Sequence, residues 1–478
     1  MRILELSVVI GVLAYIIRLL SPSPGIFSWL NFIPLLCLPV LGLHLILEGY
    51  RWQMAPAYLL VFMSAMYAFA PQLKDVQLQY FAGLLALGVL GVAIVLSTVF
   101  PVFQLPGPTG PYSVGTQIRR LVDTHRREPA DPGSNRELMV QIWYPAEPSA
   151  RGKQAFYRER ASTTASDARF ALVETHSIVD APIVAVPTRL PLLLYTPSWD
   201  GMRTENTVHA EDLASHGYIV VGIDHPYSSL ATVFPDGRVI RTKLVDEDFF
   251  SSEAAYAEFL HTAEAEIRLR ADDARFVLDE LEKLDADDPK GLLGGRVDLA
   301  RAGIFGFSLG AGAAAQACWL DRRFKACVNL DGMMAGESSR QGAVAPFFII
   351  SEPEPPAPES FPNGKQAELR EMAFEREQYL QMRKLMSAYG GSWLTITGSE
   401  HFNFSDYAFS SPLRRFSNSG PVGAENASRL VGRYMLAFFN LHLMDLDDRV
   451  LDPQSPHAPE ARLEDWKPRT DERRFHSG

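Results

Sequence analysis

The hydrophobic positions of this chain are concentrated at its start, in four almost continuous apolar runs within the first hundred residues. The runs cover residues 4–20, 29–47, 54–71 and 80–99. Each has about the 17–20 residues that a helix needs to cross a hydrocarbon core of roughly 30 Å. A signal peptide would explain only the first run. The pattern therefore predicts a transmembrane helical region of about four spans over residues 1–103.

Charged residues are rare inside these runs, and the runs show no paired charges. Glu5 and Arg18 lie near the two ends of the first run, where we expect both side chains to reach the interface. Four spans place both ends of the region on the same side of a membrane. The basic residues then divide into Arg2, Arg51, Arg119 and Arg120 on one side and Arg18 and Lys74 on the other. This bias predicts a multi-pass integral membrane protein with a cytoplasmic C-terminal domain.

The periodicity changes after a Pro/Gly-rich stretch at residues 101–111. Short apolar or β-branched runs of strand length follow at residues 138–144, 190–195, 218–223, 301–305, 326–330, 345–350 and 393–397. Helical patterns occupy residues 254–283, 365–389 and 427–443. Strands that alternate with helices predict an α/β domain whose mostly parallel sheet is flanked by helices. We divide the chain into the membrane region (1–103), a linker (104–112), the α/β domain (113–452) and a polar C-terminal tail (453–478).

Composition narrows the classes of function. The 478 residues include 45 Lys and Arg against 56 Asp and Glu, which gives a net charge of −11. An acidic chain without a dense basic patch is a poor match for nucleic acid, where phosphate neutralisation supplies much of the affinity. The three cysteines, Cys37, Cys318 and Cys327, are too few for a disulfide framework and form no CxxC pair for zinc. We expect neither a metal nor an organic cofactor.

The chemistry begins at the segment Gly306-Phe307-Ser308-Leu309-Gly310. A predicted strand precedes it and a small-residue helix follows it, which is the context of a nucleophile elbow in an α/β-hydrolase fold. The flanking glycines give a strained turn the room that a Cβ would fill. The alternative is a Gly-rich packing turn without chemistry.

A nucleophilic serine needs a base, and in this fold the order along the chain is serine, acid, histidine. The histidines after Ser308 are His401, His442, His457 and His476. His401 alone directly follows a predicted strand, so its side chain is expected at the carboxyl edge of the sheet. Asp331 ends the strand after the elbow helix and is the expected acid, with Asp321 and Asp406 as rivals. Asp331 could instead be a turn-capping residue before Gly332.

An oxyanion hole needs two backbone N–H donors. We expect one from Leu309, directly after the nucleophile, and one from the loop after the strand at 190–195. Trp199 is the expected donor in that loop, although it could also be a wall of the acyl pocket or a packing residue.

With these residues in place, the chain resembles the platelet-activating-factor acetylhydrolase family, the secreted-type phospholipase A2 group within the α/β-hydrolases. The shared segments are GPYSVGT (110–116), LMVQIWYPA (138–146), DLASHGYIVVGIDH (212–225), GFSLGAG (306–312), LDGMM (330–334), PFFIISE (346–352) and TGSEHFNFSDYAF (397–409). The resemblance implies a calcium-independent serine esterase that removes a short or oxidised acyl chain from glycerophospholipids. Ser308, Asp331 and His401 fall on the family's nucleophile, acid and base.

The chain departs from the family in two places. Pro197-Ser198 replaces the His-Gly pair that usually opens the oxyanion loop, and the N-terminal region has no counterpart in the animal enzymes. Polyester- and cutin-degrading hydrolases share part of the pattern. The leading hypothesis is a membrane-anchored lipid or carboxylic-ester hydrolase. The alternatives are a general carboxylesterase or cutinase-like esterase, and an inactive hydrolase-like domain on a membrane transporter or receptor.

Overall fold

The computed structural model describes residues 2–21, 28–68, 76–186, 188–244, 248–289, 291–361 and 364–467. Lys74 and His476, used in the predictions above, lie outside these residues. By contacts the chain divides into two compact units. The first, here called the helical unit, comprises residues 1–104, 156–173 and 410–417, and the second, the sheet unit, comprises the rest.

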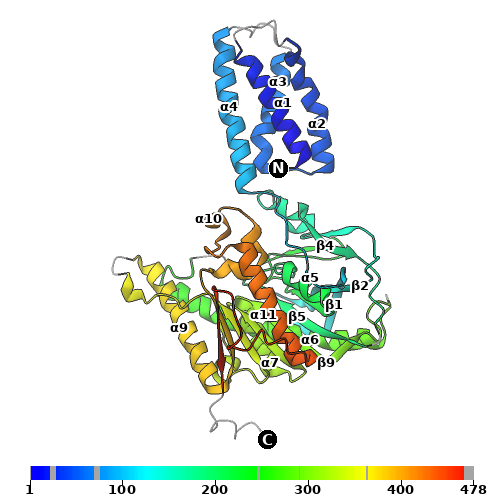
Figure 1. The fold of residues 1–478 in the computed structure, drawn as a ribbon, viewed down its shortest axis with the longest axis vertical. Coiled ribbons are helices and arrows are strands. Elements are labelled where there is room, and N and C mark those ends of the chain that lie inside the picture. The colour runs from blue at the N-terminus through cyan, green and yellow to red at the C-terminus, as the bar shows by residue number, and fades with distance from the viewer. Residues whose placement is uncertain are drawn as a thin grey trace. The chain divides into compact units, whose positions relative to one another are not determined.

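The helical unit contains four apolar helices that lie side by side (Figure 1): α1 (Ile3–Leu19), α2 (Ile33–Leu47), α3 (Ala55–Ala68) and α4 (Val76–Val99). Val8, Leu41, Val61 and Leu90 are among the buried residues between them. Their outward faces are apolar as well; Ile10, Leu36, Met66 and Phe81, for example, are each more than half exposed. Helices that are apolar on every face are typical of an apolar environment.

The prediction of four membrane spans is corrected to two candidates. Among the described residues, Leu30–Leu47 and Val76–Val99 have the length and apolarity of a span. The helices α1 and α3 have 17 and 14 residues. Residues 69–71 of the apolar run at 54–71 lie outside the described residues.

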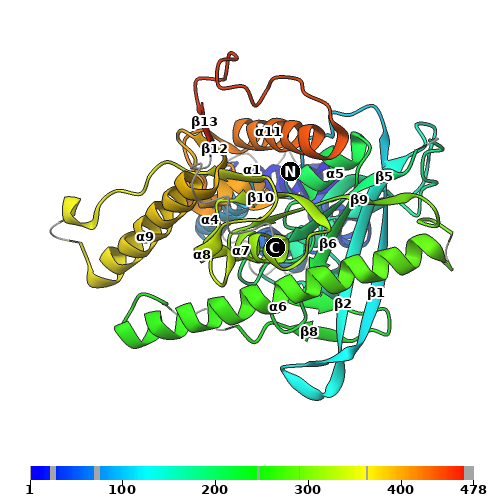
Figure 2. The same cartoon turned by 90° about the horizontal axis from the view of Figure 1, so that it is seen from below.

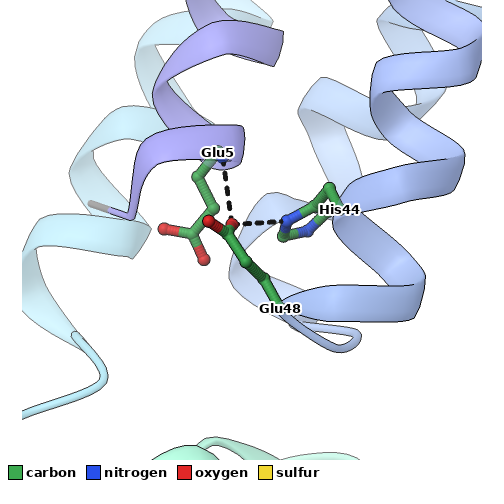
Figure 3. A group of neighbouring side chains, drawn as sticks. All are labelled: Glu5, His44 and Glu48. Atoms are coloured by element: carbon green, nitrogen blue, oxygen red, sulfur yellow. Dashed lines mark hydrogen bonds and ion pairs between the residues drawn. The ribbon is translucent and has the colours of Figure 1, made fainter.

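The expectation for Glu5 is also wrong, because this side chain is buried and paired. Its carboxylate accepts hydrogen bonds from Arg51 Nη1 at 2.8 and 3.0 Å and from Arg2 Nη2 at 3.2 Å. The neighbouring Glu48 accepts from the first N–H groups of α1 and contacts His44 Nδ1 at 2.9 Å (Figure 3). The helical unit therefore contains a buried ionic network where the apolar pattern predicted unpaired charges.

Two segments from far along the sequence complete the helical unit. The Arg169 guanidinium donates to the carbonyls of Pro101 at 3.0 Å and Ser410 at 2.6 Å. The Ser411 hydroxyl donates to the carbonyl of Val99 at 2.6 Å. A short helix, α10 (Arg414–Ser417), ends the second of these segments. The helical unit is thus built from three stretches of chain.

The sheet unit is built on one mixed sheet of 11 strands in the order β13-β12-β11-β10-β9-β5-β6-β2-β1-β4-β3. The strands are β1 (Ser113–Glu128), β2 (Asp131–Ala146), β3 (Gln154–Phe156), β4 (Glu174–Val179), β5 (Leu190–Thr196), β6 (Ile219–Asp224), β9 (Val297–Phe307), β10 (Phe324–Leu330), β11 (Phe347–Ser351), β12 (Gly391–Ile396) and β13 (Ala461–Trp466). The six from β12 to β6 are parallel. A separate hairpin pairs β7 (Ala231–Val233) with β8 (Val239–Arg241).

Helices cover both faces of this sheet. The helices are α5 (Thr207–Ser215), α6 (Glu253–Ala286), α7 (Leu309–Leu320), α8 (Ser338–Gln341), α9 (Gln366–Tyr389) and α11 (Ala424–Met444). One buried cluster joins the sheet to α6, α7 and α9, and another joins it to α5 and α11. Figure 2 shows α6 on one side of the strands and α11 on the other. The predicted mostly parallel sheet flanked by helices is confirmed.

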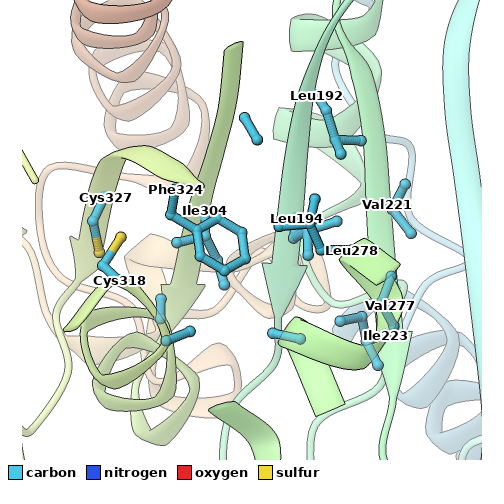
Figure 4. Close-up of a cluster of buried hydrophobic side chains, with 14 of the residues drawn as sticks. Leu192, Leu194, Val221, Ile223, Val277, Leu278, Ile304, Cys318, Phe324 and Cys327 are labelled. Atoms are coloured by element: carbon cyan, nitrogen blue, oxygen red, sulfur yellow. The ribbon is translucent and has the colours of Figure 1, made fainter. Parts of the chain in front are cut away.

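The central strands are apolar along their whole length because both of their faces are buried. Figure 4 shows Leu192 and Leu194 of β5 beside Val221 and Ile223 of β6. Cys318 and Cys327 lie in the same cluster as free, buried thiols. Within the predicted polar tail, Ala461–Trp466 form an edge strand antiparallel to β12. Its alternating sequence buries Ala461 while charged neighbours remain accessible.

Candidate active site

Ser308 lies on the turn between β9 and α7. Its φ is +55° and its ψ is −124°, a region that costs a non-glycine residue about 1–3 kcal/mol. The flanking glycines allow this turn. A Cβ on Gly306 would clash with the carbonyl of Gly310, and a Cβ on Gly310 would clash with the carbonyls of Thr196 and Pro197. The strained turn presents the hydroxyl at the carboxyl edge of the sheet.

Asp331 directly follows β10 and also has a positive φ, +49°. The Asn329 side chain braces this turn, accepting from the N–H of Gly332 at 2.8 Å and donating to its carbonyl at 3.1 Å. The N–H of Glu352 donates to Asp331 Oδ1 at 3.0 Å. These contacts fix the carboxylate and leave Oδ2 for a further partner.

His401 is that partner. It opens a short 3₁₀ turn after β12, and its Nδ1 lies 2.7 Å from Asp331 Oδ2. Its Nε2 lies 3.0 Å from Ser308 Oγ. The Phe307 ring packs against the imidazole with centroids 4.8 Å apart. The structure therefore brings the three residues that the sequence singled out into one hydrogen-bonded chain.

The surroundings of His401 act on its pKa in opposite directions. Burial lowers the pKa, while the hydrogen bond and the negative charge of Asp331 raise it and prevail. The net result is a pKa above the ordinary 6.5 of histidine. A raised pKa makes the neutral imidazole a stronger acceptor for the Ser308 proton and stabilises the imidazolium that forms when it takes that proton.

The loop after β5 lies beside the start of α7. Trp199, Leu309 and Ser308 line the same pocket. The N–H of Leu309, the first residue of α7, has no acceptor in its own helix. The Trp199 ring packs on Phe249 and Phe259, with centroid distances of 5.1 and 5.5 Å. The Trp199 side chain is therefore a pocket wall, and the expected donor role would fall to its backbone N–H.

The pocket has a volume of about 290 Å³ and two contrasting walls. Aromatic rings of Phe249, Phe250, Phe259 and Phe374 form one wall. Carboxylates form part of the other: burial and the charge of Asp331 raise the pKa of Glu352 to about 9. Burial, with the charges of Glu371 and Asp331, raises the pKa of Glu375 to about 7.

Comparison with known proteins places this geometry in a family. The family model of platelet-activating factor acetylhydrolase, isoform II, matches residues 98–454, which is well over half of the chain. The chain belongs to this family. The match covers every strand of the sheet described above except β13.

The individual relatives that match this chain are distant in sequence. It is 22% identical over 270 residues to a platelet-activating factor acetylhydrolase of Cavia porcellus, covering 53% of this chain and 58% of the relative. It is 24% identical over 269 residues to a probable 1-alkyl-2-acetylglycerophosphocholine esterase of Arthroderma benhamiae, covering 52% and 64%. These matches span less than two thirds of each relative. The solved structure of a ferulic acid esterase from Streptomyces cinnamoneus aligns with a TM-score of 0.59 at 29% identity, covering 76% of this chain and 99% of that one.

The two alternative candidates for the catalytic acid, Asp321 and Asp406, have other partners. Asp321 follows α7 and binds the Arg323 guanidinium at 2.6–3.1 Å. Asp406 is buried and accepts from the N–H of Val208 at 3.3 Å. Neither is hydrogen-bonded to His401 in the described part of the chain.

His442 and His457, the alternative histidines within the described residues, have other neighbours. The His442 ring packs on Phe438 with centroids 4.6 Å apart. His457 Nδ1 lies 2.7 Å from the Tyr434 hydroxyl. Neither packs near Ser308.

One group of side chains in the described residues has the spacing of metal ligands. Its members are Glu5, His44 and Glu48, whose donor atoms lie within 4.8 Å of one another (Figure 3). The Glu5 carboxylate is occupied by Arg51 and Arg2, and Glu48 accepts two backbone N–H groups. Two guanidinium groups beside the cluster supply the positive charge that a cation would bring, so the network is complete without one.

Apart from Trp199, sequence reasoning missed the aromatic and acidic side chains that line the pocket. The aromatic wall comes from the loop before α6, from α6 itself and from α9, which are distant in sequence. Glu352 had a usable signal, because it comes directly after β11 and therefore lies at the carboxyl edge of the sheet. No such signal marks Glu375, whose position depends on how α9 packs.

Proposed function

We propose that this protein is a membrane-anchored serine carboxylic-ester hydrolase that removes short or oxidised acyl chains from phospholipids. The observation that carries the proposal is the chain of hydrogen bonds from Ser308 Oγ through His401 to Asp331. Membership of the acetylhydrolase family and the esterase names of the relatives support ester hydrolysis.

The geometry suits a two-step acyl transfer. Ser308 Oγ attacks the ester carbonyl carbon while His401 Nε2 takes the hydroxyl proton and then returns it to the leaving alcohol. Asp331 orients the imidazole and stabilises its cationic form. The N–H groups of Leu309 and Trp199 stabilise the oxyanion of each tetrahedral intermediate. Water, deprotonated by His401, then releases the acid from the acyl-enzyme.

The size of the pocket supports a short acyl group. Its volume of about 290 Å³ lies at the lower end of the range for small-molecule sites, roughly 300–1,000 Å³. The aromatic wall suits apolar acyl carbons, and the partly protonated carboxyl groups of Glu352 and Glu375 can donate to the oxygens of an oxidised chain.

Membrane anchoring is supported by the helical unit. Two of its helices have the length and apolarity of a span, and outward-facing residues such as Leu36 and Phe81 are more than 60% exposed. Water disfavours such a surface, and lipid does not. Two spans also leave both ends of residues 1–103 on one side of a membrane, where Arg2, Arg18, Arg119 and Arg120 outnumber the basic residues between the spans, and this excess favours a cytoplasmic sheet unit.

A general carboxylesterase is the second candidate, and a specific observation favours it. The ferulic acid esterase aligns over 99% of its own length, and the pocket has a wall of four phenylalanines that suits aromatic esters. The third reading, an inactive hydrolase-like domain, is disfavoured because the proposed nucleophile, base and acid are assembled at hydrogen-bonding distance.

Turnover of p-nitrophenyl esters of graded chain length, of feruloyl esters and of short-chain and oxidised phospholipids in vesicles tests these candidates. We expect a preference for phospholipids with short or oxidised sn-2 chains. Faster turnover of feruloyl or other soluble esters than of vesicle lipids would favour the second candidate. No turnover of any ester, with no fluorophosphonate labelling of Ser308, would leave only the inactive domain.

A further inference from the structure

A loop beside the nucleophile is held from two sides by buried charged side chains. We propose that Arg270 and Glu205 are positioning residues that hold residues 197–200 so that the Trp199 N–H faces the oxyanion formed at Ser308. The inference rests on the proposed serine-hydrolase function and goes beyond it. It concerns how a loop that opens with Pro197-Ser198 keeps a donor in place.

Arg270 approaches the loop from α6. Its side chain is fully buried, and Nη1 donates to the carbonyls of Pro197 at 2.8 Å and Ser198 at 2.6 Å. Nη2 donates to the carbonyl of Trp199. Nε pairs with Glu266 at 3.2 Å, so the remaining donor group of the fork is also engaged. One guanidinium therefore orients three successive carbonyls. A lysine ammonium lacks the planar, forked set of donors that this requires.

The orientation of these carbonyls fixes the orientation of the next N–H. A peptide group is planar and trans, so its N–H points opposite to its C=O. The Ser198 carbonyl points at Arg270, and the Trp199 N–H in the same peptide group therefore points away from Arg270. Trp199 lines the pocket together with Ser308 and Leu309, so the pocket is the open side of the loop.

Glu205 holds the same loop from its inner side. Its side chain is 1% exposed; Oε2 accepts from the N–H of Ser198 at 2.8 Å, and Oε1 accepts from the Ser198 hydroxyl at 2.6 Å. The Tyr195 hydroxyl lies 3.3 Å from Oε2. A Cβ on Gly201 would clash with this carboxylate and with the Ser198 N–H, so the turn is closed tightly around Glu205.

The two holding groups bind the backbone of the same residue, Ser198. The N–H of Ser198 points to Glu205, and its carbonyl points to Arg270. Preorganised donors of this kind need no reorganisation when negative charge develops on the substrate. Loosening either group should therefore weaken binding of the transition state more than binding of the substrate.

The test compares Arg270→Lys and Glu205→Gln with Arg268→Lys, an exposed arginine two residues away on α6 that pairs with Glu337. Measurements are kcat and KM on a soluble p-nitrophenyl ester, and the Ki of an alkyl boronic acid that adds to the serine as a tetrahedral mimic. We expect Arg270→Lys to lower kcat about 10²–10³-fold with KM changed less than about threefold, since one oxyanion donor is worth about that much. The Ki should rise in parallel, and Arg268→Lys should match the wild type.

Ser198→Ala covers the case in which the buried variants do not fold. It removes only the hydroxyl contact with Glu205, and we expect a fall in kcat of about threefold to tenfold with a matching rise in Ki. An unchanged boronate Ki in the folded variants would overturn the inference, since a purely structural role affects stability and not binding of the tetrahedral mimic. Fluorophosphonate labelling of Ser308 in the wild type distinguishes failure of the proposed function from failure of this inference. If Ser308 is not labelled, both fail. If Ser308 is labelled, an unchanged Ki contradicts only the role of Arg270 and Glu205.

Discussion

The two units of this protein place apolar and charged residues in different ways. In the sheet unit the strands and the inner helix faces are apolar, and the outer helix faces are charged, as along α6 and α9. In the helical unit the helices are apolar on every face, and charges gather in a buried network around Glu5 and Arg51. The first arrangement suits water and the second suits lipid.

Both units nevertheless pair their buried charged side chains in the same way. In the sheet unit Asp273 binds Arg136 at 2.6 Å and His225 at 2.8 Å, all fully buried. In the helical unit Glu5 binds Arg51 at 2.8 Å. A buried charge is tolerated when its partner is close and its remaining hydrogen bonds are made. The solvent around a unit therefore decides the polarity of its surface, while its buried charges are paired in either case.

The strongest test of this division asks whether all the chemistry lies in the sheet unit. Ser308→Ala should lower kcat about 10⁶-fold, since triad members act as a unit. A fluorophosphonate probe should label the wild type at Ser308 and leave the variant unlabelled. Ser251→Ala, an exposed serine, is the matched control. Residual labelling in the variant would place the nucleophile elsewhere.

A second test sharpens the role of Asp331 through pH. His401 must be neutral to accept a proton, so kcat/KM should fall as pH drops through its raised pKa. Asp331→Asn removes the hydrogen bond and the negative charge that contribute most to raising this pKa, so the acidic limb should move to lower pH. The plateau should fall about 10⁴-fold. If Asp321→Asn has this effect and Asp331→Asn does not, the acid is misassigned.

A third test concerns the helical unit alone. Arg51→Met should destabilise the protein by about 3 kcal/mol, because the buried Glu5 carboxylate loses its closest ion-pair partner and keeps only Arg2. Thermal unfolding in detergent measures the loss, and Arg429→Met, on an exposed arginine of α11, is the control. The double variant Glu5→Gln/Arg51→Met should recover part of the loss. At temperatures where the variant is folded, its kcat on soluble esters should equal that of the wild type. A lower kcat there would contradict the idea that all the chemistry lies in the sheet unit.

The smallest expected effect lies on the outer surfaces. Leu36 in the helical unit is 65% exposed and Leu446 in the sheet unit is 55% exposed. Leu36→Lys should weaken partition into lipid vesicles by about 3 kcal/mol, the scale for a lysine near a helix centre. Leu446→Lys should change it by less than about 0.5 kcal/mol. Vesicle flotation measures both, and equal effects would contradict a lipid-facing helical unit.

The sequence predicted local features of the sheet unit well. Runs of apolar residues located β5, β6 and β10, because central parallel strands are buried on both faces. The residues proposed for chemistry were found because chain order and strand ends limit where Ser308, Asp331 and His401 can lie.

Features that depend on long-range packing could not be predicted. Nothing in the sequence around Arg270 indicates that it binds the loop at residues 197–199. The helical pattern of α6 is equally consistent with an exposed arginine at position 270. The same holds for Glu5. A single carboxylate near a helix end predicts a position at the membrane interface, and only the folded structure shows that Arg51 lies beside it. Counting apolar residues also overestimated the spans, since two helices among the described residues have the length and apolarity of one.

The three-part origin of the helical unit has a consequence for synthesis of the chain. Residues 1–104 leave the ribosome first, but their unit also needs residues 156–173 and 410–417. Domains generally fold as they emerge, with the N-terminal one first. Here the earliest helices must wait until most of the sheet unit has been made before Arg169 can bind the carbonyl of Ser410. The first region to be translated is therefore among the last to be completed, and a chain stopped before residue 410 leaves it unfinished.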